Sequence, residues 1–80
     1  MTIGNAVRAR ILSLCEARGI AVNKLATLSG VTQSTLNNLI SGRNHSTTVS
    51  TIQKLCDGLD MTITEFFQSE LFENLEQELK

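Results

Sequence analysis

Four polar residues on one short stretch of the sequence, Gln33, Ser34, Asn37 and Asn38, share one face of an expected helix, because they are spaced i, i+1, i+4 and i+5. Their side chains both donate and accept hydrogen bonds, as the edges of nucleic-acid bases require. Asn and Gln pair with adenine N6 and N7, whereas Glu would be repelled by phosphates and Lys would bind them without discriminating sequences. Each residue alone is equally well explained as neutral surface. Together they predict a face that reads DNA bases.

The elements around this face predict a helix-turn-helix. Thr32 is a good N-cap for a helix over Gln33–Ser41, and Gly42 ends it. A shorter helix over Val22–Ser29 precedes it and ends at Gly30. The apolar positions expected to be buried in the two helices are Leu25, Ala26, Leu28, Leu36, Leu39 and Ile40. A tight turn between two short helices can place the second helix in the DNA major groove.

The remaining chain predicts three more helices and no strand. The first covers Ile3–Arg18, and its apolar face consists of Ile3, Val7, Ile11, Leu14 and Cys15. The fourth is entered from Thr47 or Thr48, and its apolar face consists of Val49, Ile52, Leu55, Cys56 and Leu59. The segment Thr62–Glu65 reads as a capping box that opens a fifth helix with Phe66 and Phe67. The fold class is therefore all-α, a compact five-helix bundle.

Size and composition argue against an enzyme. A chain of 80 residues buries only about 60% of its unfolded surface, which leaves little room for an enclosed active site. The sequence offers no nucleophile with a base beside it and no glycine loop to cradle phosphate, so we expect no catalytic residues and no cofactor. Cys15 and Cys56 lie at apolar positions without ligand spacing, which favours buried free thiols over a disulfide or metal site. No apolar run approaches the roughly 20 residues of a membrane span, and we expect a cytoplasmic protein with no membrane contact.

The charges divide along the chain. Residues 1–56 contain six Lys and Arg against Glu16 alone, whereas residues 57–80 contain seven Asp and Glu against Lys80 alone. This asymmetry is typical of a surface that faces a polyanion, with an acidic tail turned away, although such a small basic excess is also common in proteins that bind nothing charged.

Two ordered stretches carry a family resemblance. They are KLATLSGVTQSTLNNLISGR at Lys24–Arg43 and TIQKLCDGLDMTITEFF at Thr51–Phe67. The sequence resembles the Cro/repressor-type (XRE-like) helix-turn-helix transcriptional regulators over roughly Val7–Phe67. The resemblance implies a bundle of the phage-repressor DNA-binding-domain type, and a repressor that binds double-stranded DNA as a homodimer on a pseudo-palindromic operator.

The resemblance also implies roles for individual residues. Gln33, Ser34 and Asn38 fall where bases are read, and Asn37 shares their face. The expected phosphate-binding residues are Asn23, Lys24, Thr32, Thr35, Arg43, Asn44, His45, Ser46 and Thr48. His45 has a second explanation, because a lone loop histidine is more often simply solvated.

Two positions depart from the family pattern. Ala21 and Val22 stand where members often have Ser or Thr followed by a phosphate-binding Gln. Either the second helix starts later, with Asn23 taking a polar role, or one family phosphate contact is absent. Ile40 replaces a common acidic residue and extends the apolar face.

The C-terminal segment is expected to be distinct. We predict a DNA-binding domain over residues 1–69 and an acidic helical tail over residues 70–80, in which Leu71, Leu75 and Leu79 form a stripe. The stripe is either a fraying helix or a seam for a partner chain. If it is the main contact surface, the chain is instead a protein-interaction or antitoxin-like module on the same scaffold.

Overall fold

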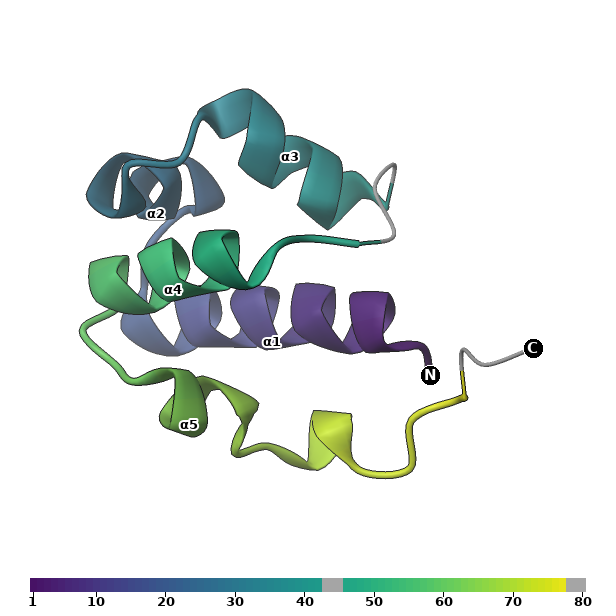
Figure 1. Cartoon of the computed structure of the whole chain (residues 1–80). Coiled ribbons are helices and arrows are strands. Elements are labelled where there is room, and N and C mark those ends of the chain that lie inside the picture. Colours follow the sequence, from purple (N-terminus) through teal and green to yellow (C-terminus); the bar gives the residue numbers. More distant parts are fainter. Residues whose placement is uncertain (43–45, 78–80) are drawn as a thin grey trace.

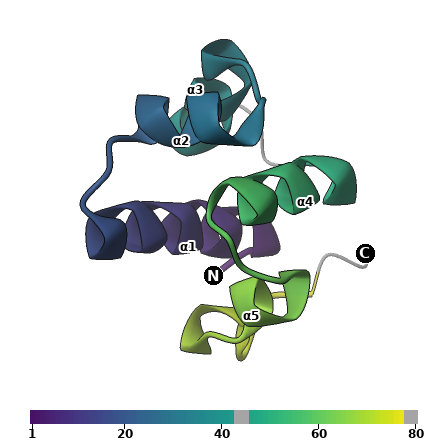
Figure 2. The same cartoon turned by 90° about the vertical axis from the view of Figure 1, so that its left-hand side faces the viewer.

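The computed structural model describes residues 1–42 and 46–77 of the chain. Its elements are α1 (Ile3–Arg18), α2 (Val22–Ser29), α3 (Gln33–Ser41), α4 (Val49–Gly58), α5 (Ile63–Phe67) and the 3-10 turn η1 (Glu70–Phe72). Figure 1 shows three tiers, with α2 and α3 at the top, α1 and α4 in the middle, and α5 and η1 at the bottom. The side view in Figure 2 keeps this order. The predicted all-α, five-helix fold is confirmed.

Threonine caps the start of every α-helix of the described chain except α2. The caps are Thr2, Thr32, Thr48 and Thr62. Each hydroxyl accepts a hydrogen bond from the backbone N–H three residues later, at 3.0 to 3.2 Å. Such a bond satisfies a donor that the helix itself leaves unpaired and contributes roughly 0.5–2 kcal/mol. Ala21 stands at the start of α2 and offers no side-chain cap.

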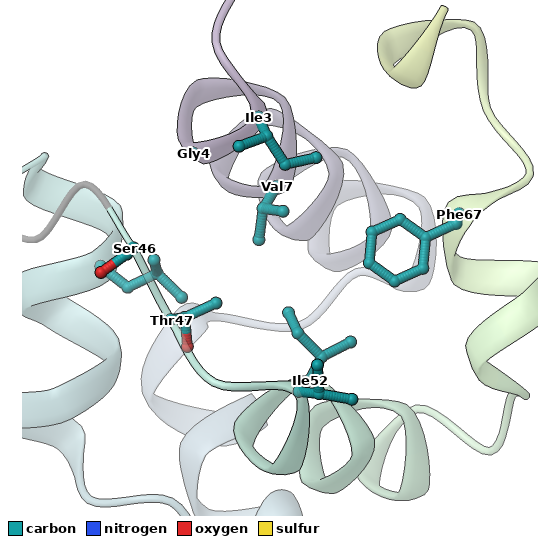
Figure 3. Close-up of a pocket in the computed structure, with 9 residues that line it drawn as sticks. Ile3, Gly4, Val7, Ser46, Thr47, Ile52 and Phe67 are labelled. Carbon is teal, nitrogen blue, oxygen red and sulfur yellow. The ribbon is translucent and has the colours of Figure 1, made fainter. Parts of the chain in front are cut away.

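The core lies where the three tiers meet, and all five α-helices contribute to it. Its buried side chains are Val7, Ile11, Leu14, Cys15, Leu25, Ala26, Leu36, Leu39, Ile52, Leu55, Cys56, Leu59 and Phe66. The predicted burial of both free cysteines is confirmed, and burial raises the pKa of each thiol. These thiols therefore stay protonated at neutral pH. At one end of the core, a pocket opens between α1, α3, α4 and Phe67 (Figure 3).

Two residues expected in the core are exposed instead. Leu28 is 49% exposed, and Val49 is 73% exposed. The expectation for Leu28 was wrong because Ser29 takes the position on α2 that faces α4, where it packs directly against Gly58. Val49 is the first residue of α4 and lies beyond the edge of the core. Helical periodicity identified the apolar stripe but not where the neighbouring helix covers it.

Two arginines of α1, Arg10 and Arg18, hold the C-terminal ends of α5 and α4 by hydrogen bonds. Arg10 donates from Nε to the backbone carbonyl of Phe66 at 2.7 Å and from Nη2 to that of Glu65 at 2.9 Å. Arg18 donates from Nη1 to the backbone carbonyl of Leu59, just past the end of α4. Hydrogen bonds from a charged donor to helix-end carbonyls satisfy acceptors that the helix leaves unpaired.

The predicted helical tail is wrong for the described part of residues 70–80. Helix α5 ends at Phe67, and only the single turn η1 follows before the chain becomes irregular. The Phe72 ring packs 4.8 Å from that of Phe67 and 6.1 Å from that of Phe66, between ring centroids. Ser69 caps the turn by accepting from the N–H of Leu71. Aromatic packing and the Ser69 cap therefore stand where the four-residue apolar spacing predicted a continuous helix.

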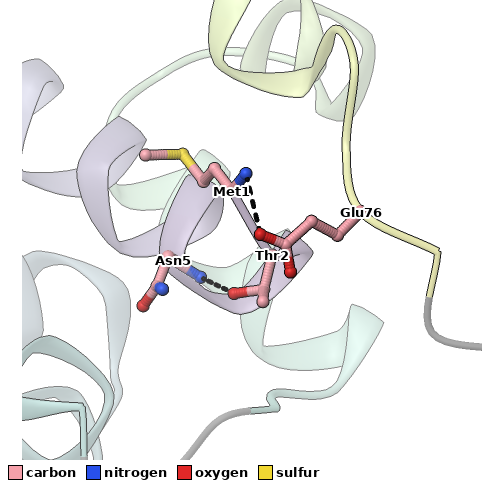
Figure 4. Close-up of polar contacts among 4 residues, drawn as sticks. All are labelled: Met1, Thr2, Asn5 and Glu76. Carbon is pink, nitrogen blue, oxygen red and sulfur yellow. Dashed lines mark hydrogen bonds and ion pairs between the residues drawn. The ribbon is translucent and has the colours of Figure 1, made fainter.

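The chain beyond η1 is tied to the start of α1. The N–H of Glu76 donates to the carbonyl of Met1 at 3.1 Å, and Glu76 Oε1 lies 3.3 Å from the Met1 ammonium (Figure 4). Leu71 and Leu75 are half-buried, so they do not form an exposed helical stripe. Leu79, the third member of the predicted seam, lies outside the described residues.

Candidate nucleic-acid interface

The turn between α2 and α3 is fixed by the backbone. Gly30 adopts a left-handed conformation with φ of 69°, which glycine reaches without steric cost. The N–H of Val31 donates to the carbonyl of Ala26 at 3.2 Å, and Val31 packs against the core. Thr32 then caps α3. These contacts hold α3 in one orientation relative to α2.

Helix α3 has one buried and one polar side. Leu36 and Leu39 are buried and fasten the helix to the bundle. Gln33, Ser34 and Asn37 are exposed on the opposite side. Their side chains make no hydrogen bond to any other residue in the described ranges, so their donors and acceptors remain available.

Asn38, the fourth member of the predicted reading face, is less accessible. It is half-buried, whereas Gln33, Ser34 and Asn37 are exposed. The structure therefore groups exposed Gln33, Ser34 and Asn37 with a half-buried Asn38.

The start of α3 carries two hydroxyls in mutual contact. Thr32 accepts from the N–H of Thr35 at 3.1 Å and donates to Thr35 Oγ1 at 2.7 Å. The Thr32 proton is thus committed within the chain, whereas the Thr35 proton is free to point outward. Both residues are exposed, and Thr35 is the one whose hydroxyl proton can still be donated to a partner.

Asn23 and Lys24 lie on the exposed first turn of α2. The helix begins at Val22, which contradicts the alternative of a later start. Val22 is half-buried against the core, so the position that often carries a polar Gln in related sequences carries a packing residue here. The polar side chains available at this helix start are therefore those of Asn23 and Lys24.

The segment leading into α4 offers further hydroxyls. Ser46 and Thr48 are exposed, and the Thr48 hydroxyl accepts from the N–H of Thr51 at 3.0 Å. The other predicted phosphate-binding residues of this segment, Arg43, Asn44 and His45, lie outside the described residues.

Arg8 is a cation that the sequence reasoning did not place at this surface. A Cβ atom built on Gly42 would lie 3.8 Å from Arg8 Nη1, so the guanidinium reaches the C-terminal end of α3. Arg10 lies about 200° further around α1 and points to α5 instead. The signal was therefore present in the spacing: one of these arginines faces the helix-turn-helix, whereas the other faces the bottom tier.

One group of acidic residues lies apart from the polar face of α3. The acidic residues Asp57, Asp60 and Glu65 surround a shallow depression where α4 meets α5, away from α3. Hydrogen bonds from the backbone and side chain of Thr62 lower the pKa of Glu65. These carboxylates are thus separated from the polar face of α3, where a polyanion would otherwise be repelled.

The described ranges limit other chemistry. They contain no group of three or more His, Cys, Asp or Glu residues that could hold a metal ion. No helix within them has the length and apolarity to cross a membrane. The polar face of α3, with the hydroxyls and cations around it, is therefore the principal candidate site of this part of the chain.

Comparisons with known proteins agree with this geometry. The family model for the Cro/C1-type helix-turn-helix DNA-binding domain matches residues 10–70. A solved structure, described as the crystal structure of the prophage Lp1 protein 11, is 33% identical in sequence and superposes with a TM-score of 0.78. The match covers 86% of this chain and 91% of that one. The search of curated proteins gives no match.

Proposed function

We propose that this chain, which belongs to the Cro/C1-type helix-turn-helix DNA-binding domain family, is a transcriptional repressor that reads an operator with α3. The observation that carries the proposal is the face of α3. Gln33, Ser34 and Asn37 are exposed there, and their hydrogen-bonding groups are unused within the described chain. Leu36 and Leu39 anchor the opposite side.

This face suits the major groove, which admits an α-helix and presents a distinct donor and acceptor pattern for each base pair. Gln33 stands in the first turn of α3, and Asn37 lies one turn further along the same side. We infer that Gln33, Ser34 and Asn37 contact base edges and that the half-buried Asn38 contacts a further base.

Phosphate contacts would surround this face and set its register without reading sequence. We infer that Asn23, Lys24 and Thr35, which are exposed at the starts of α2 and α3, contact one DNA strand. Thr32 would contribute to these contacts as the N-cap of α3 and through its backbone. Ser46, Thr48 and Arg8 lie at the other end of α3 or just after it. Arg43, Asn44 and His45 join this second group on sequence position alone.

We further propose that two copies bind a pseudo-palindromic operator. One helix of this length covers only a few base pairs, and two copies related by a twofold axis would read half-sites about 10 base pairs apart. Repression then follows from occupancy of a promoter.

The alternative function is a protein-interaction module, whose main contact surface would be the apolar C-terminal segment. Leu71 and Leu75 are half-buried within their own chain, and Phe72 packs on Phe66 and Phe67. The described part of that segment therefore does not favour the alternative over DNA binding.

Selection of bound sequences from random duplex DNA, at a stated salt concentration, tests the proposal. We expect an enriched sequence with two related half-sites whose centres are about 10 base pairs apart. Gln68→Ala, on the exposed end of α5, is a control that should select the same sequence. Recovery of unenriched DNA by the folded protein would contradict sequence-specific binding.

A further inference from the structure

A pocket of about 230 Å³ lies below the C-terminal half of α3 and shares only Ser46 with the proposed DNA contacts of the described residues. Its floor consists of core side chains from three helices, Val7, Leu39 and Ile52, which are 3–4% exposed. Its rim includes Val49, which is 73% exposed, and Phe67, which is 38% exposed. Figure 3 shows Val7, Ile52 and Phe67 around the same space.

The lining determines what could bind there. It is built mainly from aliphatic and aromatic side chains, and no charged side chain of the described ranges contributes to it. Its only polar side chains in those ranges are the hydroxyls of Ser46 and Thr47. A charged ligand would lose its hydration without gaining a counter-ion, at a cost that binding would not recover. The lining within the described ranges therefore favours an uncharged, apolar molecule.

Its volume limits the size of that molecule. An apolar cavity of about 150 Å³ lined by Leu, Ile and Phe stays dry and binds benzene. Pockets for drug-sized ligands measure roughly 300–1,000 Å³. At about 230 Å³, the pocket lies between these two cases.

We propose that this pocket binds a small, uncharged apolar or aromatic molecule between benzene and indole in size. Such a ligand would cover the exposed apolar atoms of Val49 and Phe67 while packing on the core side chains beneath. It would touch Leu39 of α3 and Ile52 of α4 together, and so bridge the recognition helix and the helix that follows it.

A consequence for regulation rests on the proposed function. Because the ligand contacts α3 on the side opposite its reading face, occupancy should change operator affinity by about fivefold or more, the usual lower range of coupling between two sites. Ligand binding itself is measured without DNA, so failure of the repressor proposal would leave the pocket proposal separately testable.

The test is a methyl NMR titration of the whole chain with benzene, with indole, and with benzoate as a charged probe of similar shape. We expect saturable shifts at Val7, Leu39 and Ile52 with benzene and indole, and none with benzoate. Gly4→Leu adds a side chain at a glycine that lines the pocket and should weaken binding at least about tenfold by occupying its volume. Ala17→Leu, on the exposed far end of α1, is the matched control and should bind as the wild type does.

Val49→Asp gives a second variant that does not depend on repacking, because it places a charge on an exposed rim residue and should also weaken benzene and indole binding. Absence of saturable shifts in the wild type would overturn the proposal, as would equal affinity in wild type, Gly4→Leu and Val49→Asp. Sedimentation supplies the other contrary outcome: a wild-type dimer that Gly4→Leu converts to a monomer, without ligand shifts, would assign the pocket to a second copy of the chain.

Discussion

The polar face of α3 in the top tier and the capping box of α5 in the bottom tier use their side chains in opposite ways. In the bottom tier, Glu65 accepts from the N–H of Thr62 at 2.9 Å, and the carbonyls of Glu65 and Phe66 accept from Arg10. In the top tier, Gln33, Ser34 and Asn37 make no side-chain hydrogen bond to another described residue. Both tiers are built from short helices, so the difference is not one of length. The hydrogen bonds of Glu65 and Arg10 hold the fold, whereas the side chains of Gln33, Ser34 and Asn37 are left for a partner.

Removing the apolar anchor of α3 should have the largest effect. Leu36 is fully buried, and Leu36→Ala should lower the free energy of unfolding by about 2–5 kcal/mol because it leaves a cavity in the core. Leu28→Ala, at a residue that is 49% exposed, is the matched control and should cost much less. Urea denaturation of both variants provides the measurement. Equal losses would mean that α3 is not held by its buried side.

The close approach of α2 and α4 should be the next most sensitive feature. A Cβ atom at Gly58 would lie 2.2 Å from Ser29 Oγ and 3.1 Å from its Cα. Gly58→Ala should therefore push the two helices apart and cost about 1–3 kcal/mol of folding free energy, as overpacking does. Adding Ser29→Ala removes the clashing hydroxyl, which has no hydrogen-bond partner among the described residues, and should restore part of the loss. A double variant no more stable than Gly58→Ala would rule out this contact as the cause.

Two of the three arginines of α1, Arg8 and Arg10, allow a direct comparison between the tiers. Arg10→Met should reduce stability by about 1–2 kcal/mol, because two partly exposed charge-assisted hydrogen bonds are lost, and should leave the operator footprint unchanged. Arg8→Met should do the reverse, with little change in stability but weaker binding to all DNA sequences and a salt slope reduced by about 0.9. Thermal denaturation and salt-dependent binding of both variants test this. If both variants affect only stability, the assignment of Arg8 to the DNA side is wrong.

The capping box of α5 should give the smallest effect, visible mainly as pH dependence. The folded-state pKa of Glu65 is lowered by its hydrogen bonds to Thr62, so its ionised form stabilises the fold above the unfolded carboxyl pKa of about 4.3. That contribution should be lost as pH falls through the lowered folded pKa. Glu65→Gln keeps an acceptor but not the charge, so its stability difference from wild type should shrink in acid. A difference that is constant between pH 7 and pH 3 would contradict this origin.

Much of the fold could be predicted because the ends of its helices are set by residues close to them in the sequence. Thr32 and Gly42 bound α3, Gly30 ends α2, and the Thr62 capping box starts α5, each by contacts within a few residues. The polar face of α3 follows from the same helix period. Such features need no knowledge of the neighbouring elements.

The features that could not be predicted depend on which element lies next to which. Which of Leu28 and Ser29 is buried depends on Gly58, which lies against Ser29 of α2. Arg8 and Arg10 differ only in which tier each faces. The segment after α5 does not continue as the predicted helix, because the Phe72 ring packs against the Phe67 ring of α5. In each case, a contact between residues distant in sequence overrides the local pattern.

The most direct test of the central claim is the ratio of affinities of folded Gln33→Ala for its selected operator and for a scrambled duplex, at one salt concentration. If α3 reads bases, the binding free-energy difference between operator and scrambled DNA should fall by about 1–3 kcal/mol relative to wild type, while affinity for scrambled DNA stays nearly constant. Gln68→Ala, on the opposite tier, should keep the wild-type ratio. A Gln33→Ala ratio equal to that of wild type would contradict base reading by this residue and the account built on it.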